Sequence, residues 1–336
     1  MNFDLTDDQR AIQRTARDFL AAGYKPEEIR RLAYETDRGF TDEGWQRICE
    51  LGWPALLVDE EHGGLGLGVV ELVVVQEELG AALAPSPFLS TIAAAALIAD
   101  AGSDEQRERW LPGLAAGEAR GTVATLRDGD GWAAVPDAAG ADVVVVRDGD
   151  GWALAEGTGV SAEPAQALDP TRRLWSIEVG GEREPLPGDG ARAADVIAVA
   201  LAAESVGVAQ RTLDMAVAYA KEREQFGRPI GAYQAVSHTC AQMLLEVEGA
   251  RSMVLYAAWA LDHEPESGPL AASMAKAYAS DAGWRVPAAA LQVHGGIGFT
   301  WEHDLHLWLK RGKANAYLWG DAGEHRARVA QLIGLE

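Results

Sequence analysis

The sequence predicts an α+β protein in which a small β region lies between two helical regions. Apolar residues recur at helical spacing up to about residue 117 and again from residue 191. Between these regions, short β-rich stretches alternate with Asp-Gly pairs, which favour tight hairpin turns. A chain of 336 residues suffices for two or three domains and a large buried core. We predict an N-terminal helical domain at 1–119, a β-domain at 120–189 and a C-terminal helical bundle domain at 190–336.

The N-terminal region has recognisable helix starts. Thr6 is a candidate N-cap, and Gln9 three residues later completes a capping box. Ile12, Ala16 and Leu20 then lie on one apolar face. Thr41 is a second candidate cap, and a glycine-rich loop is expected at 60–68. The further helices are predicted at 41–51, 69–82, 89–101 and 104–117.

The middle and C-terminal regions differ in their periodicity. The β-rich stretches are 121–126, 143–147 and 152–155, with Asp-Gly turns at 128–131 and 148–151. From Ala193 an apolar run leads into a helix that is expected to end near Glu224. Pro287 falls inside one of the later helices, where a proline can kink the chain. These later helices are predicted at 232–263, 268–292 and 313–333.

Composition excludes several classes of partner. Acidic residues number 51 and basic residues 29, which gives a formal net charge of -22. Such an acid excess argues against nucleic acid and against an anionic membrane surface, since both require a basic patch. Cys49 and Cys240 cannot form a disulfide framework or a metal site by themselves. The first ten residues contain three aspartates and no apolar run, so we expect no signal peptide and a reduced, cytoplasmic setting.

Two passages in the C-terminal region have the composition of ligand-binding segments. In YAKEREQFGRPIGAYQ (219–234), Arg223 and Gln234 lie on either side of a Gly-Arg-Pro turn. A guanidinium in this position can make paired hydrogen bonds to a phosphate, although a surface arginine on an acidic helix is the alternative. In LQVHGGIGFT (291–300), Gly295 and Gly296 allow a ligand to approach the backbone, or they simply end a helix. Gln292 is either a ligand contact or a buried structural glutamine.

These two passages, the opening FDLTDDQR (3–10) and the order of the three regions make the chain resemble the acyl-CoA dehydrogenase family. The resemblance covers essentially the whole chain, and it is to the shorter subunit of actinobacterial α2β2 heterotetrameric members. It implies a C-terminal four-helix bundle, a reduced β-domain, FAD as cofactor and α,β-desaturation of an acyl-CoA thioester. Electron-transfer flavoprotein is the electron acceptor that it implies.

In the family, the matching positions reach the FAD that a neighbouring chain mainly holds. Carried over to this sequence, Arg223 and Phe226 would contact the diphosphate of that FAD. The residues that would line its adenosine side are Gln234, Gln292, Gly295 and Gly296.

The chain departs from the family where the reaction needs a base. A carboxylate must remove the α-proton of the thioester. The two positions at which family members carry this glutamate correspond to Trp319 and Ile197, and neither side chain can accept a proton. Asp321, two residues after Trp319, is a weak candidate. The stretch 125–132 also departs from the family's flavin-holding pattern, so no catalytic residue is assigned.

Three interpretations follow from this pattern. The favoured one is a non-catalytic partner that completes the FAD site of a longer subunit. That longer subunit would bind most of the acyl-CoA, with a steroid side chain or another bulky acyl group as substrate. The second is a self-sufficient homo-oligomeric acyl-CoA dehydrogenase with an atypical base such as Asp321. The third is a structural paralogue without flavin.

Overall fold

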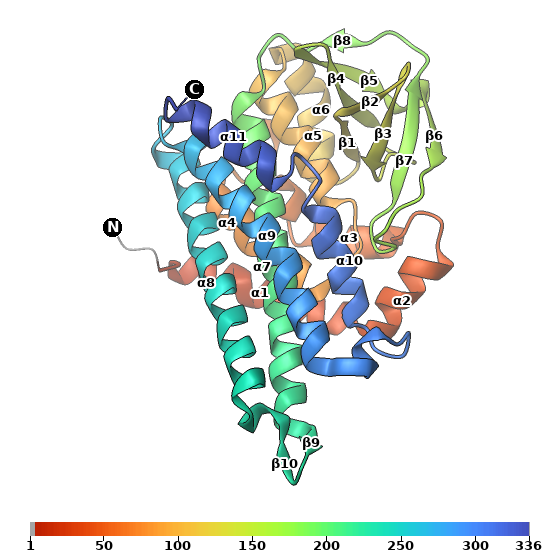
Figure 1. The fold of residues 1–336 in the computed structure, drawn as a ribbon. Coiled ribbons are helices and arrows are strands. Elements are labelled where there is room, and N and C mark those ends of the chain that lie inside the picture. Colours follow the sequence, from red (N-terminus) through yellow and green to blue (C-terminus); the bar gives the residue numbers. More distant parts are fainter. Residues whose placement is uncertain (1–3, 336) are drawn as a thin grey trace. The chain divides into compact units, whose positions relative to one another are not determined.

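The computed structural model describes residues 4–335, which form two compact units. Unit 1 comprises the described residues of Met1–Glu28, Val73–Ala84 and Ala198–Glu336. Unit 2 comprises Ile29–Leu72 and Pro85–Ile197. Along the chain the order is helices, then strands, then helices, which confirms the predicted α+β class (Figure 1).

The N-terminal region forms six α-helices in the described residues. The predicted capping box is present, because the Thr6 hydroxyl accepts from the amide of Gln9 while the Gln9 side chain accepts from the amide of Thr6. The second helix was not predicted. It begins at Pro26 and has Glu27 and Glu28 in its first turn, which is a recognisable helix start. The helices are α1 (Asp7–Gly23), α2 (Pro26–Glu35), α3 (Asp42–Glu50), α4 (Val69–Ala82), α5 (Phe88–Ala101) and α6 (Asp104–Ala116).

The strands of unit 2 form two four-stranded sheets among the described residues. One sheet has the order β1 (Gly121–Ala124), β4 (Val143–Asp148), β5 (Gly151–Glu156), β8 (Glu184–Pro185). The other has the order β2 (Leu126–Asp128), β3 (Gly131–Pro136), β7 (Leu174–Val179), β6 (Val160–Pro164). Strand β1 pairs with β4 in parallel, and the other pairs in these two sheets are antiparallel.

Both predicted Asp-Gly hairpins are present in unit 2. Asp128 pairs with Gly131 and Asp148 pairs with Gly151, so each turn has a two-residue loop. The glycine that opens each loop has a positive φ of about 60°, which only glycine adopts at little cost. Trp132 and Trp152 are buried at 1% and 5% exposure, as expected for hydrophobic residues of two hairpins.

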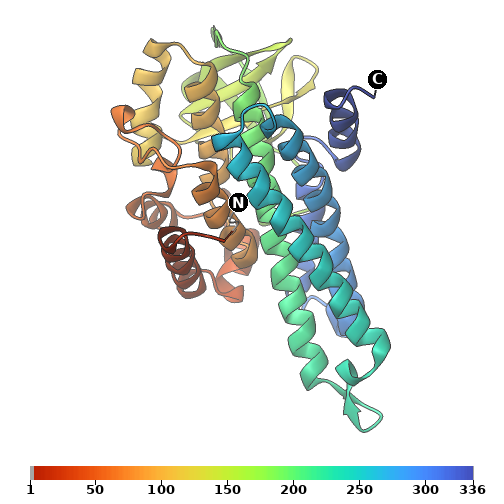
Figure 2. The ribbon, with the colours of Figure 1, turned by 90° about the vertical axis from the view of Figure 1, so that its left-hand side faces the viewer.

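The C-terminal helices of unit 1 run alongside one another, and a short hairpin joins α7 to α8 at their far end (Figures 1 and 2). Helix α9 continues through Pro287. The predicted helix at 313–333 is wrong, because it is broken into α10 and α11. The elements are α7 (Ala191–Glu222), β9 (Glu224–Gln225), β10 (Arg228–Pro229), α8 (Gln234–His263), α9 (Gly268–His294), α10 (Leu305–Asn315) and α11 (Ala322–Leu332).

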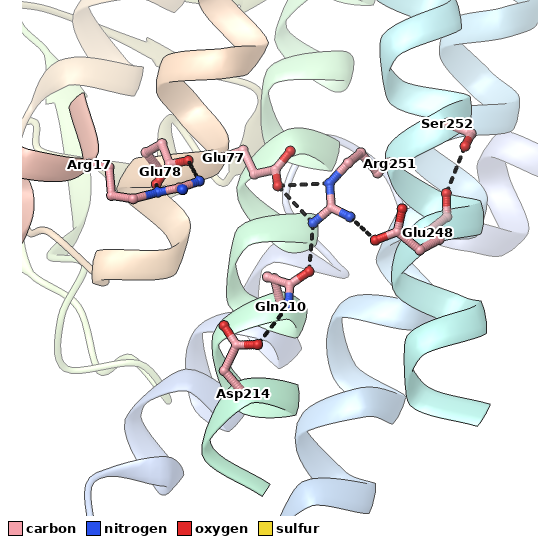
Figure 3. A network of polar contacts seen from close by, with 8 residues as sticks. All are labelled: Arg17, Glu77, Glu78, Gln210, Asp214, Glu248, Arg251 and Ser252. Carbon is pink, nitrogen blue, oxygen red and sulfur yellow. Dashed lines mark hydrogen bonds and ion pairs between the residues drawn. The ribbon is translucent and has the colours of Figure 1, made fainter. Parts of the chain in front are cut away.

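A polar network fixes the helices of unit 1 to one another (Figure 3). The guanidinium of Arg251 on α8 donates to Glu77 on α4 at 3.0 Å and to Gln210 on α7 at 2.8 Å, and it also pairs with Glu248. Burial raises the pKa of the Glu77 carboxyl, and the facing Arg251 guanidinium opposes that shift. Because three helices share one guanidinium, their relative rotation is specified by hydrogen-bond geometry as well as by packing.

Helix α7 is long and apolar enough to cross a membrane by length and composition alone. However, 89% of its apolar window is buried inside the protein, as is usual for the core helix of a folded domain. Glu204 on this helix is buried and forms an ion pair with the equally buried Arg311 of α10.

Candidate cofactor-binding site

The first candidate passage, residues 219–234, contains the hairpin at the end of unit 1. Gln225 pairs with Arg228, so Phe226 and Gly227 are the two loop residues. Both have left-handed backbone, with φ of 55° and 79°, which is the pattern of a type I′ turn. A bulky side chain rarely adopts this conformation. The Phe226 side chain is 92% exposed, so packing of its ring in a core does not offset the free-energy cost of this left-handed backbone.

The side chain of Tyr233 packs against the tip of this hairpin, which is the exposed loop at Phe226 and Gly227 with its flanking residues. The Phe226 ring meets the edge of Tyr233 with the ring centroids 6.4 Å apart, and the Arg228 guanidinium lies 4.1 Å from the Tyr233 ring centroid. The Tyr233 hydroxyl donates to the carbonyl of Gln225 at 3.1 Å. The tip is therefore held in one conformation although most of its surface faces solvent.

Arg223 lies between α7 and this hairpin. Its amide donates to the carbonyl of Tyr219, and its carbonyl accepts from the amide of Ile230, each at 2.8 Å. The side chain is exposed, and within residues 4–335 its guanidinium forms no ion pair. A fixed backbone with an unpaired, outward guanidinium suits the binding of an external anion. Gln234, the first residue of α8, is also exposed.

The second passage ends helix α9. Gln292 is exposed on the last turn, which rules out the alternative of a buried structural glutamine. A Cβ atom placed on Gly295 or Gly296 would meet nothing within 4 Å, so the backbone there borders open space. Gly298 differs, because a Cβ there would lie 3.0 Å from the Cβ of His294. Gly295 and Gly296 are thus open to a ligand, while Gly298 serves packing.

The two passages meet at the same end of unit 1. Tyr219, at the start of the first, stacks on His294 in the second with ring centroids 4.6 Å apart. His294 is 4% exposed, so this contact is a buried link between α7 and α9. The two passages that contain the six predicted cofactor residues therefore lie at one end of the helices, and Arg223, Phe226, Gln234 and Gln292 are exposed there.

The two positions that the resemblance assigns to the base are Ile197 and Trp319. Ile197 is 3% exposed, and its neighbours Val196 and Ala198 are equally buried. Trp319 has a left-handed backbone with φ of 62°, and its carbonyl accepts a hydrogen bond of 3.0 Å from Nε2 of His325. None of these side chains can take a proton.

Asp321 has a structural role that the sequence interpretation missed. It is the N-cap of α11: its Oδ1 accepts from the amide of Glu324 at 2.9 Å, and Glu324 accepts from the amide of Asp321 at 2.8 Å. The hydrogen bond from the Glu324 amide lowers the pKa of the Asp321 carboxyl. A capping carboxylate with a lowered pKa is a poor general base. The Asp-x-x-Glu spacing of a capping box is the signal that could have identified it.

Lys276 was also missed, and it anchors the turn at 316–321. Its ammonium is 1% exposed and donates to Ser280 Oγ at 2.9 Å, to the Asn315 carbonyl at 3.1 Å and to the Gly320 carbonyl at 2.9 Å. All three N–H donors are thereby satisfied. Burial lowers the pKa of this ammonium to about 8.

Comparison with known proteins identifies the family. The model of the acyl-CoA dehydrogenase N-terminal domain matches residues 6–118, and that of the C-terminal domain matches residues 192–334. The acyl-CoA dehydrogenase IpdE2 of Mycobacterium tuberculosis is 39% identical over 315 residues, which cover 93% of each chain.

Two solved structures are similar over nearly the full length of both chains. One is a variant of the Tcur3481-Tcur3483 steroid acyl-CoA dehydrogenase, with a TM-score of 0.89, 30% identity and 98% coverage of each chain. The other is the ChsE4-ChsE5 complex of Mycobacterium tuberculosis, with a TM-score of 0.91, 25% identity and 100% coverage of each chain. The chain therefore belongs to the acyl-CoA dehydrogenase family, whose members are flavoprotein oxidoreductases.

Proposed function

We propose that this chain is the non-catalytic subunit of a heteromeric FAD-dependent acyl-CoA dehydrogenase, and that it completes the FAD site of a longer subunit. One asymmetry carries the proposal. The residues for a neighbour's FAD face outward and are ready for a ligand, whereas both positions for the catalytic base hold apolar side chains. A chain that only contributes to a partner's cofactor site needs the first set and not the second.

The outward set fits the chemistry of the diphosphate and adenosine of FAD. Arg223 offers a guanidinium fork to the diphosphate, and the exposed Phe226 ring offers an apolar cover beside it. The open backbone at Gly295 and Gly296 lets a ligand approach closely. All of these groups lie at the surface of this chain, which supports a cofactor that another chain largely holds.

The reaction requires a hydride acceptor and a base, and we assign both to the partner subunit. Bound FAD supplies the acceptor for the β-hydrogen of the thioester, and a carboxylate near the α-carbon must take the α-proton. In this chain Trp319 fills the position of that carboxylate, and Asp321 is committed to capping α11. We therefore assign the base and most of the acyl-CoA site to the longer subunit.

Two of the most similar structures support both the assembly and the substrate class. Each is named as a pair of different components, and one is named as a steroid acyl-CoA dehydrogenase. By this similarity we assign the chain to the catabolism of steroid side chains or other bulky acyl-CoA thioesters. The cytoplasm stays its expected setting from the sequence. Electron-transfer flavoprotein is the assigned electron acceptor.

Co-expression with a longer acyl-CoA dehydrogenase from the same genome tests the proposal. We expect the two chains to co-purify and to desaturate a steroid acyl-CoA only together. Replacing the partner's catalytic glutamate by glutamine should abolish this activity. An active homo-oligomer of this chain alone would instead support a self-sufficient enzyme, and a flavin-free complex would support a structural paralogue.

A further inference from the structure

The buried ring of His294 in unit 1 contacts two other rings, and the reaction assigned above does not use it. It stacks on Tyr219 of α7 with ring centroids 4.6 Å apart and ring planes 22° apart. The ring of His303, which lies just before α10, is also 4.6 Å away, at a tilt of 59°. Because His294 is the last residue of α9, this one side chain joins three segments of the chain.

Hydrogen bonds to the backbone fix the orientation of both histidine rings. Nδ1 of His294 lies 2.8 Å from the carbonyl oxygen of Ala290. A carbonyl oxygen only accepts, so this Nδ1 carries a proton and donates it. Nδ1 of His303 accepts from the amide of Leu305 at 3.2 Å. Rotation of either ring would break its hydrogen bond, so the stack has a defined geometry.

The two stacked residues are each connected directly to a predicted cofactor residue. The carbonyl of Tyr219 accepts from the amide of Arg223 at 2.8 Å. His294 is followed at once by Gly295, whose φ of 64° is a conformation that glycine adopts at little cost. The stack therefore joins the segment that carries the guanidinium to the segment that carries the open glycine backbone.

We propose that Tyr219 and His294 are positioning residues for FAD, because their stack sets the separation between Arg223 and the backbone at Gly295 and Gly296. The inference rests on the proposed function. The diphosphate and the adenosine belong to one molecule of limited span, so both contacts form together only if the two protein segments are correctly spaced. Neither ring needs to touch the cofactor for this role.

Core packing alone is the simpler role for a buried histidine, and the two roles predict different measurements. A packing residue stabilises the chain and affects all ligands of the site alike. A positioning residue favours ligands that engage both segments at once, because contact with one segment raises the effective concentration at the other. Ligands of different length therefore distinguish the roles. Adenosine reaches only the adenosine side of the site, whereas ADP adds the diphosphate.

The experiment uses the complex with the longer subunit after its flavin has been removed. The Kd of FAD is measured by flavin fluorescence, and those of ADP and adenosine are measured by competition with FAD. Tyr219→Leu and His294→Leu each remove one ring of the stack. We expect each variant to raise the Kd of FAD and of ADP at least about tenfold, which equals about 1.4 kcal/mol. The Kd of adenosine should change less than about threefold, because adenosine engages one segment only.

Three further variants sharpen the test. Tyr219→Phe keeps the ring and should restore the wild-type Kd of FAD. The double variant Tyr219→Leu, His294→Leu should bind FAD less than about twofold more weakly than either single variant, because both changes remove the same contact. Trp259→Leu is the control. It removes a ring that stacks on His263 within α8, with centroids 5.2 Å apart, about seven helical turns beyond Gln234.

The outcomes distinguish the positioning role from the proposed function. The melting temperature of each complex shows whether the variant has folded, and the half-buried Tyr219 keeps the test decisive if His294→Leu does not fold. If the folded variants bind FAD as tightly as the wild type, the positioning role is overturned and the proposed function stands. If adenosine is weakened as much as ADP, the stack serves packing and the inference is wrong. If the wild-type complex binds no FAD, both fail together.

Discussion

Nζ of Lys276 donates a hydrogen bond of 2.9 Å to the carbonyl oxygen of Gly320. This contact ties the interior of α9 to the turn that contains Trp319, the position that the resemblance assigns to the catalytic glutamate. The same ammonium also holds the carbonyl of Asn315, where α10 ends. The turn is therefore fixed from inside unit 1, independently of which side chain stands at position 319.

Replacing this buried ammonium should destabilise the chain. Lys276→Met removes the ammonium that donates to the carbonyls of Asn315 and Gly320, and a buried acceptor that loses its donor costs about 1–3 kcal/mol. Urea unfolding of the variant should therefore show a clearly lower midpoint. Lys25→Met is the control, because Lys25 is an exposed lysine of the same unit. An unchanged midpoint for Lys276→Met would show that the three hydrogen bonds contribute nothing net.

The same lysine predicts a pH dependence of stability. Its pKa is about 8 in the folded chain and 10.5 in the unfolded one, so between these values the unfolded state binds more protons. The free energy of unfolding should therefore rise between pH 8 and 10.5 by up to about 1.4 kcal/mol per pH unit. We expect the difference between wild type and Lys276→Met to grow over this range. A constant difference would mean that Lys276 titrates normally.

Arg223→Ala should weaken FAD retention by the complex with the longer subunit. A charge-assisted hydrogen bond to phosphate contributes enough free energy for a loss of about tenfold or more in affinity. The choice of acyl chain should not change, because Arg223 is assigned to the cofactor. FAD content after gel filtration measures the effect, and Arg14→Ala is a control at an exposed arginine of α1. Equal FAD content in both variants would make Arg223 an ordinary surface residue.

Two substitutions at Asp321 separate capping from proton transfer. Asparagine is as good an N-cap as aspartate but is not a base, whereas alanine is neither. Asp321→Asn should therefore keep both the stability and the turnover of the complex, and Glu324→Gln should keep turnover within a few-fold. Asp321→Ala should lower the unfolding midpoint with little effect on turnover. Loss of the partner's glutamate should cost about 10²–10⁴-fold in rate. A large rate loss in Asp321→Asn would favour the self-sufficient enzyme.

Trp319→Glu restores a carboxylate at the family position, yet we expect no activity from this chain alone. The base and the flavin must flank the same Cα–Cβ bond, and this change supplies only the base. Stopped-flow measurement of flavin reduction by acyl-CoA, with added FAD, is the assay. Rapid reduction by the variant alone would show that the chain holds a flavin by itself.

The sequence predicted those features that neighbouring residues determine. The Thr6–Gln9 capping box and the Asp-Gly hairpins are local, and both are present. The single helix at 313–333 was wrong although its interruption also has a local signal, since Asp321 and Glu324 form the capping box that begins α11. Lys276, about 40 residues earlier, draws the carbonyls of the turn inward, and no local pattern reveals this.

The residues of the candidate site could be proposed from the sequence, but their structural surroundings could not. The apolar character of Trp319 and Ile197 follows directly from the letters of the sequence. The exposure of Gln292 and Phe226 does not, since Gln292 follows an apolar stretch and Phe226 is itself apolar. The capping role of Asp321 could have been found from the spacing to Glu324, because capping is local.

Flavin stoichiometry tests the central claim most directly. Visible flavin absorbance and protein concentration are measured for this chain alone and for its complex with the longer subunit. The account predicts a colourless chain alone and one FAD for each pair of chains in the complex. A chain that purifies alone with one FAD per protomer and desaturates an acyl-CoA would contradict it.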